Sequence, residues 1–222
     1  MTPFGGSFIA WVTYGSVLGM SCVLIRTERK KRRIRRHVRI LKRRFFHPRN
    51  VILAQDETDL LLFPPLRAAW ALKGQTSCVP LTGFNAKRVV FGAINLKTGY
   101  RLMEARERHR GEDFREFLWQ IHLRYREWKV ALLLDQDSTH TARKSQSLAF
   151  ALDIKFVWLP ARSPELNPMD HLWRHGKQAI CANHQYPTID REVDHFTEYI
   201  QGLSTQDALR KAGILSPNFW LR

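Results

Sequence analysis

Three aspartates lie where short apolar runs end or where a helix is expected to begin. Asp56 closes the run VILAQD, Asp135 closes the run VALLLD, and Asp170 follows the phrase SPELNPM. Carboxylates fixed by backbone geometry are suitable ligands for two hard cations, which can clamp the attacking and leaving oxygens of a phosphodiester. The pattern therefore predicts a two-metal site in which Asp56, Asp135 and Asp170 are both the metal ligands and the catalytic residues.

The turn around the third acid explains why its carboxylate would be fixed. Asn167 can cap a helix, and Pro168 suits the first helical position because its missing N–H has no partner there. Asp170 then falls in the first turn. The simpler interpretation is structural, because an acid at the third helical position is typical of a capping box, and an Asp at a strand end is commonly a turn residue.

Other polar residues near these positions remain open as alternatives. Glu57 would point to the opposite side of a continuing strand from Asp56, which favours a structural role. Asp137 follows Asp135 by two residues and is a second-choice ligand. His171 and His175 have the i, i+4 spacing of zinc ligands, but no third ligand follows at a suitable spacing.

Taken together, these phrases resemble the catalytic domain of DDE/D transposases, of the mariner-type superfamily and its bacterial insertion-sequence branch. Asp135 and Asp170 have 34 residues between them, and the second of them stands inside SPELNPMDHLW. The resemblance covers residues 51–187. It departs from the pattern at the third acid, which is usually Glu in the bacterial branch, and at Gln136-Asp137, which replaces Asn and a small residue.

The resemblance implies a function and its requirements. It implies a transposase, an endonuclease that cuts DNA at transposon ends and transfers the strand, with two Mg²⁺ ions that Mn²⁺ can replace. The implied partners are transposon-end and target DNA and a second copy in a homodimer, and the implied location is cytoplasmic and nucleoid-associated. Residues expected to contact nucleic acid are Trp70, Lys73, Lys87, Arg88, His140, Arg162, Arg174 and Lys177. Trp70 and Lys73 match a family W-x-x-K-G phrase, although a core residue followed by a turn explains them equally well.

The expected fold is α/β. Apolar runs and helical periodicity predict a ribonuclease-H-like domain with a mixed five-stranded sheet and helices on both faces. Its first and fourth strands should be neighbours, which would bring Asp56 and Asp135 together. The expected strands are residues 51–56, 87–95, 100–106, 130–134 and 155–159, and the expected helices are residues 114–128, 142–152 and 168–182.

Outside this domain, charge dominates the sequence. The chain of 222 residues has a formal net charge of +16 and a pI near 10.4, which favours nucleic acid or an anionic membrane surface as partner. Residues 26–49 contain thirteen Lys and Arg and one Glu. The predicted organisation is an uncharged apolar segment at 1–25, a basic helical linker at 26–50, the catalytic domain at 51–187 and a helical tail at 188–222.

Two other functions remain open from sequence. Residues 4–25 lack charge and precede a basic flank, so a membrane-anchored basic protein is one alternative, and a truncated or frame-shifted copy with a non-family N-terminus is the other interpretation of that segment. A copy that binds DNA without cleaving it is the second functional alternative. Three dispersed cysteines fit neither a metal site nor a disulfide framework.

Overall fold

The computed structural model describes residue 32 and residues 50–70, 73, 78–161 and 163–220. The basic segment and the apolar residues 4–25 lie outside this part of the chain, apart from residue 32. The strands are β1 (Asn50–Leu61), β2 (Lys87–Asn95), β3 (Arg101–Arg106), β4 (Lys129–Leu134) and β5 (Ile154–Trp158). The helices are α2 (Gly111–Tyr125), α3 (Ser138–Thr141), α4 (Arg143–Ala151), η1 (Pro164–Leu166), α5 (Pro168–Gly176), η2 (Lys177–Cys181), α6 (Ile189–Gly202) and α7 (Thr205–Lys211).

The strands form one mixed sheet in the order β3-β2-β1-β4-β5, which confirms the predicted fold. The first three strands are antiparallel, and β4 and β5 run parallel to β1. β2 and β3 are joined by a tight turn in which Gly99, at a φ of +69°, takes the left-handed conformation that glycine favours. The predicted adjacency of the first and fourth strands is therefore confirmed.

One strand differs from its prediction. β1 does not stop at Asp56 but continues to Leu61, because its pairing with β2 extends beyond its pairing with β4. The last β1–β4 pair is Ala54 with Leu133, whereas the β1–β2 pairs continue as far as Leu61 with Lys87. Asp56 thus lies beyond the part of β1 that pairs with β4 but is still within β1. The expectation that Asp56 sits at a strand exit is wrong.

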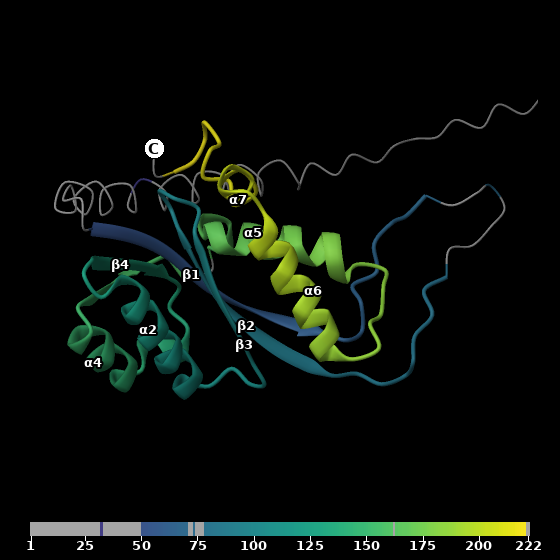
Figure 1. Cartoon of the computed structure of the whole chain (residues 1–222), viewed down its shortest axis with the longest axis horizontal. Coiled ribbons are helices and arrows are strands. Elements are labelled where there is room, and N and C mark those ends of the chain that lie inside the picture. The colour runs from purple at the N-terminus through teal and green to yellow at the C-terminus, as the bar shows by residue number, and fades with distance from the viewer. Residues whose placement is uncertain (1–31, 33–49, 71–72, 74–77, 162, 221–222) are drawn as a thin grey trace, which may run out of the picture.

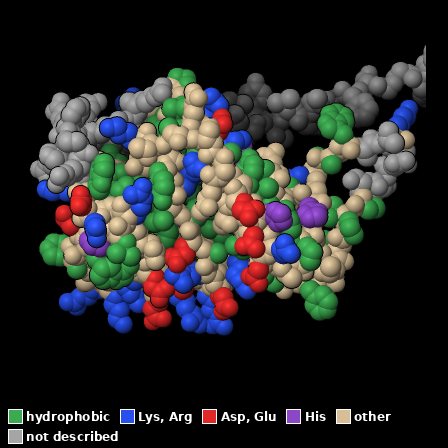
Figure 2. All heavy atoms as spheres, viewed as in Figure 1, with side chains coloured by type: hydrophobic (Ala, Val, Ile, Leu, Met, Phe, Trp, Pro, Cys, Tyr) green, Lys and Arg blue, Asp and Glu red, His purple; other side chains and the backbone are tan. Residues whose placement is uncertain are grey.

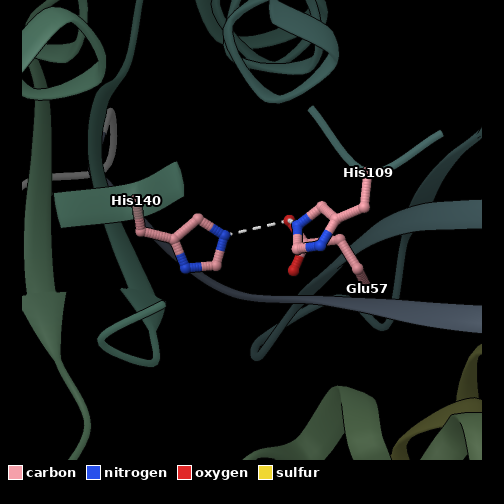
Figure 3. A group of neighbouring side chains, drawn as sticks. All are labelled: Glu57, His109 and His140. Atoms are coloured by element: carbon pink, nitrogen blue, oxygen red, sulfur yellow. Dashed lines mark hydrogen bonds and ion pairs between the residues drawn. The ribbon is translucent and has the colours of Figure 1, made fainter. Parts of the chain in front are cut away.

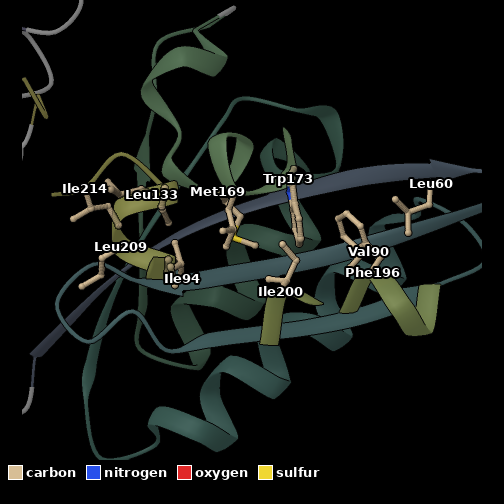
Figure 4. Close-up of a cluster of buried hydrophobic side chains, with 14 of the residues drawn as sticks. Leu60, Val90, Ile94, Leu133, Met169, Trp173, Phe196, Ile200, Leu209 and Ile214 are labelled. Atoms are coloured by element: carbon tan, nitrogen blue, oxygen red, sulfur yellow. The ribbon is translucent and has the colours of Figure 1, made fainter. Parts of the chain in front are cut away.

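Helices cover both faces of the sheet (Figure 1). One face packs against α2 and α4 and buries Phe114, Phe117 and Ile121. The other face packs against α5, α6 and α7, where Trp173 and Phe196 lie over the sheet (Figure 4). The segment predicted as a C-terminal helical tail thus contributes α6 and α7 to the core beside the candidate site.

Membrane association was the other expectation for this chain. Within the residues that the structure describes, no helix is both long enough and apolar enough to span a bilayer.

Candidate active site

Asp56 lies on β1 and Asp135 directly follows the neighbouring strand β4, and both face the same side of the sheet. Side chains alternate between the faces of a strand, and the paired residues Ala54 and Leu133 both belong to the core beneath α5. Asp56 and Asp135 each follow one of these two residues at a distance of two positions. Both carboxylates therefore point toward the face that α5 covers, at the end of the β1–β4 pair.

The third acid lies on α5, the helix that packs on β1. Asn167 caps this helix by accepting a hydrogen bond from the Met169 amide at 3.0 Å, as predicted, and Asp170 lies in the first turn. α5 approaches the sheet closely at Gly92, the residue paired with Asp56. A Cβ added at Gly92 would lie 2.5 Å from the Trp173 ring, so only glycine leaves room for the helix here.

The charges of the other two acids act on Asp56, although the three aspartates are not among the groups of described residues whose ligand atoms all lie within 4.8 Å of one another. Burial raises the pKa of Asp56 well above its usual value, and the negative charges of Glu57, Asp170 and Asp135 raise it further. A carboxylate buried beside other carboxylates disfavours its own charged form unless a cation is supplied. This environment is typical of a cation-binding cluster.

Asp135 is held from the other side of the sheet by His140. The Nδ1 atom of His140 lies 2.9 Å from Asp135, and its Nε2 atom lies 2.9 Å from Glu57. Burial disfavours the charged imidazole, but the hydrogen bonds to Asp135 and Glu57 outweigh it and raise the pKa of His140 to about 10. The charged ring therefore donates from both nitrogens, and its bond lowers the pKa of Asp135.

Glu57, His109 and His140 together form a group with the composition of a metal site (Figure 3). Their ligand atoms all lie within 4.8 Å of one another. The Oε1 atom of Glu57 already accepts hydrogen bonds from His140 and from Gln55, the latter at 2.8 Å. A metal at this point would have to displace the Nε2 proton of an imidazole whose pKa is about 10, so the group is better explained as a carboxylate neutralised by donors.

The sequence missed this arrangement. His140 was expected to touch nucleic acid, but it is 1% exposed and both ring nitrogens are engaged within the protein. Its partner Glu57 is 83 residues away in sequence, so no local spacing could have revealed the pair. Asp137, the second-choice ligand, caps α3 instead by accepting from the Thr139 amide at 2.8 Å.

The residues expected to contact nucleic acid differ in their surroundings. Trp70 and Lys73 are exposed on the segment that follows β1, whereas Arg162 lies outside the described residues. Lys87 pairs with Asp59 at 2.7 Å. Arg88 pairs with an acid of α6 at 3.0 Å. These two cations are thus neutralised in part within the protein.

The remaining two cations lie on α5 and on η2, which directly follows it. Arg174 donates to Asp170 at 2.8 Å, one helical turn away. Lys177 is partly buried, and burial lowers the pKa of its amine, while the charges of Asp59, Asp170 and Asp56 oppose this shift. The Nε2 atom of His171 lies 3.1 Å from the Glu165 carbonyl, to which its N–H donates.

Comparison with solved structures supports the fold. A Mos1 transposase paired-end complex with the left transposon end superposes with a TM-score of 0.62 and 19% identity, covering 99% of this chain and 65% of that one. The isolated catalytic domain of the Mos1 mariner transposase gives a TM-score of 0.57 with 19% identity, covering 87% of this chain and 91% of that domain. Mos1 paired-end complexes have also been solved with Mn and with Mg.

Sequence comparison adds family relationships. A 39 kDa protein of insertion element IS630 from Shigella sonnei is 29% identical over 159 residues, and the protein y4pE/y4sA of Sinorhizobium fredii is 33% identical over 66 residues. The matches cover 69% and 30% of this chain and slightly less than half of each relative, 46% and 47%. The family model described as DDE superfamily endonuclease matches residues 51–191. The chain belongs to the DDE superfamily endonuclease family.

Proposed function

We propose that this chain is the metal-dependent catalytic part of an insertion-sequence transposase, with Asp56, Asp135 and Asp170 as its catalytic and metal-binding residues. The observation that carries the proposal is the placement of Asp56 and Asp135 at the end of the β1–β4 pair, on the face covered by the helix that carries Asp170. The raised pKa of Asp56, caused first by burial and then by the charges of neighbouring acids, Asp170 and Asp135 among them, supports it. The donor set fits Mg²⁺ or Mn²⁺, since carboxylate oxygens are the ligands these hard cations prefer. The proposed catalytic part spans residues 51–187, preceded by a basic DNA-contacting segment at 26–50.

The chemistry is hydrolysis of a DNA phosphodiester, followed by transfer of the freed strand. Two bound ions would lower the pKa of the attacking water or hydroxyl and stabilise the leaving oxygen. The chain contributes the three carboxylates, and it fixes one of them, because His140 holds Asp135 by a 2.9 Å bond while Glu57 holds His140. No side chain needs to form a covalent intermediate with DNA in this scheme.

DNA contact is proposed for residues around the acids. Trp70 and Lys73 are exposed, so they can reach a DNA strand. Arg174 binds Asp170, and Lys177 follows on η2, where the charges of Asp59, Asp170 and Asp56 act on its amine. A phosphate bound near Asp170 would compete with these acids for both cations. Lys87, Arg88 and Arg162 are also proposed to contact the DNA backbone. His140, which was first expected among these residues, is not included. We also propose that the DNA is a transposon end and that the protein acts as a homodimer. Both proposals are based on the family relationship.

Nicking of supercoiled plasmid tests the proposal, because it does not depend on recognition of a particular DNA end. Purified protein is incubated with Mn²⁺, Mg²⁺ or EDTA, beside Asp135→Asn and the control Asp194→Asn, which removes an exposed acid of α6. We expect metal-dependent nicking by the wild type and the control, and a loss of at least about 100-fold in Asp135→Asn, because a metal ligand is removed.

Two other outcomes would overturn the proposal. Nicking that survives Asp135→Asn would reject the acid triad. DNA binding without nicking in either metal would favour the alternative function, a DNA-binding protein that does not cleave.

A further inference from the structure

Asn167 makes hydrogen bonds both to the helix that carries Asp170 and to the strand that carries Asp56. Its side-chain oxygen accepts from the Met169 amide and so fixes the start of α5. Its side-chain amide donates to the Gln55 carbonyl of β1 at 2.9 Å. Gln55 directly precedes Asp56, so one side chain connects the strand that carries the first acid with the helix that carries Asp170.

The place of this bond in the sheet explains why a side chain is used. The β1–β4 pairing ends at Ala54 and Leu133, so the Gln55 carbonyl lies beyond the last paired residues of these strands. Asn167 is 3% exposed and Gln55 is fully buried. A buried carbonyl without a partner costs about 1–3 kcal/mol, and Asn167 supplies that partner.

The turn that carries Asn167 is itself held from the C-terminal side. Its backbone amide donates to the Pro164 carbonyl at 2.9 Å, within η1. The buried indole of Trp220 donates to the Leu166 carbonyl at 2.9 Å. The turn is therefore anchored to β1 by Asn167 and to the end of the described chain by Trp220.

The connection continues from Gln55 to the second acid. The side-chain amide of Gln55 donates to Glu57, which binds His140, and His140 binds Asp135. Hydrogen bonds and one residue of backbone thus join all three acid-bearing elements, with Gln55 at the centre.

We propose that Asn167 is a positioning residue that sets the separation of Asp170 from Asp56, and thereby the affinity of the acid cluster for divalent metal. The effect on metal affinity rests on the proposed function. The connection between α5 and β1 rests on the hydrogen bonds alone. Its role is distinct from helix capping, since capping requires only the side-chain oxygen and the connection requires the side-chain N–H.

Two substitutions separate these roles. Asn167→Asp keeps a capping oxygen but has no N–H to donate, and Asn167→Ser keeps a cap without adding charge, because Asn, Asp and Ser cap comparably. The matched control is Asn183→Asp, which removes a similar 2.9 Å bond from a side-chain amide to the Arg67 carbonyl. Asn183 has a φ of +57°, which Asp also tolerates.

The measurements are hydrogen–deuterium exchange of the metal-free protein and calorimetric titration with Mn²⁺. In both Asn167 variants we expect faster exchange in peptides covering the Asp56 region of β1 and the first turn of α5, and Mn²⁺ affinity about 10–100-fold weaker, as for other residues that orient metal ligands. The control should keep wild-type exchange in these peptides and wild-type affinity.

Each contrary result has one meaning. Unchanged exchange in both Asn167 variants would overturn the connection, and faster exchange with unchanged Mn²⁺ affinity would overturn the positioning role and leave Asn167 a structural residue. Wild-type protein that binds no Mn²⁺ would reject the proposed function and with it the effect on metal affinity, while the exchange data would still decide whether Asn167 joins α5 to β1.

Discussion

At the scale of single residues, the candidate acids differ more in their surroundings than in their chemistry. Burial and neighbouring carboxylates raise the pKa of Asp56, whereas a hydrogen bond from His140 lowers that of Asp135. Asp135 is 53% exposed on its side chain yet has a buried, charged donor behind it. This donor fixes the orientation of the Asp135 carboxylate and leaves its solvent-facing side open. Such an arrangement suits a ligand that must bind a metal close to a substrate.

Replacing His140 tests whether this donor matters. We expect His140→Gln to lower nicking by about 10–100-fold and to raise the Mn²⁺ concentration needed for half-maximal nicking, because Asp135 loses its fixed orientation. The control is His109→Gln, since His109 lies 3.9 Å from Glu57 and does not contact Asp135 in the described structure. Equal losses in the two variants would show that the histidines act only through general stability, which thermal unfolding of both proteins would check.

The sequence singled out three candidate acids but not the side chains that support them. Apolar runs that end on acids are local features, so they were enough to single out Asp56 and Asp135, whereas the adjacency of the first and fourth strands was expected from the ribonuclease-H-like fold. Asn167 was recognised as a helix cap, yet its second bond crosses 112 positions in sequence and required the folded structure. The same holds for Glu57, which strand alternation assigned correctly to the opposite side without revealing its partner.

At the scale of secondary-structure elements, the position of α5 on the sheet decides where the third acid stands. The helix packs on β1 and β2 through Met169 and Trp173 (Figure 4). Both side chains lie where a Cβ at Gly92 would stand. The sequence predicted α5 and its cap but could not predict this contact, because it depends on the register that pairs Gly92 with Asp56. The length of β1 escaped prediction for the same reason, since the antiparallel partner β2 supports its last residues.

Gly92→Ala is therefore expected to displace α5. The added Cβ would lie 2.5 Å from the Trp173 ring and 2.6 Å from the Met169 methyl. The methionine methyl can rotate away, whereas the rigid indole ring cannot. We expect a loss of about 1–3 kcal/mol in the free energy of unfolding, a Tm lower by about 2–4 °C for each kcal/mol, and nicking reduced more than stability alone explains.

Gly202→Ala is the matched control, because a Cβ at Gly202 meets nothing within 4 Å. It should leave nicking unchanged and Tm unchanged or slightly higher. A Gly92→Ala protein with wild-type Tm and wild-type nicking would show that α5 can move without disturbing Asp170.

At the scale of the whole molecule, positive charge is distributed unevenly along the chain. Of 36 Lys and Arg and 20 Asp and Glu, thirteen cations and one acid fall in residues 26–49, which leaves 23 cations and 19 acids elsewhere. The surface in Figure 2 agrees, since Lys and Arg side chains there are interspersed with Asp and Glu. Composition alone was enough to find this asymmetry, because net charge does not depend on the fold.

The asymmetry predicts which cations control DNA affinity. Replacing Arg32, Arg33, Arg35 and Arg36 with Gln should weaken binding to a random duplex and make it less sensitive to salt. The slope of log affinity against log salt should become shallower by about 0.9 for each phosphate that the variant no longer neutralises, because neutralising a phosphate releases its counterions. Fluorescence anisotropy between about 50 and 200 mM salt measures the slope.

The control for this prediction removes the same number of charges from exposed positions between the end of α2 and the start of β5, β5 included: Arg126, Lys129, Lys144 and Lys155 are replaced with Gln. Both variants fall from +16 to +12, so net charge and long-range attraction change equally. If affinity followed net charge alone, the two slopes would agree. A shallower slope in the first variant only would assign the phosphate contacts to the basic segment. The domain of mixed charge would then hold the acids, which must bind metal where the electrostatic field is not strongly positive.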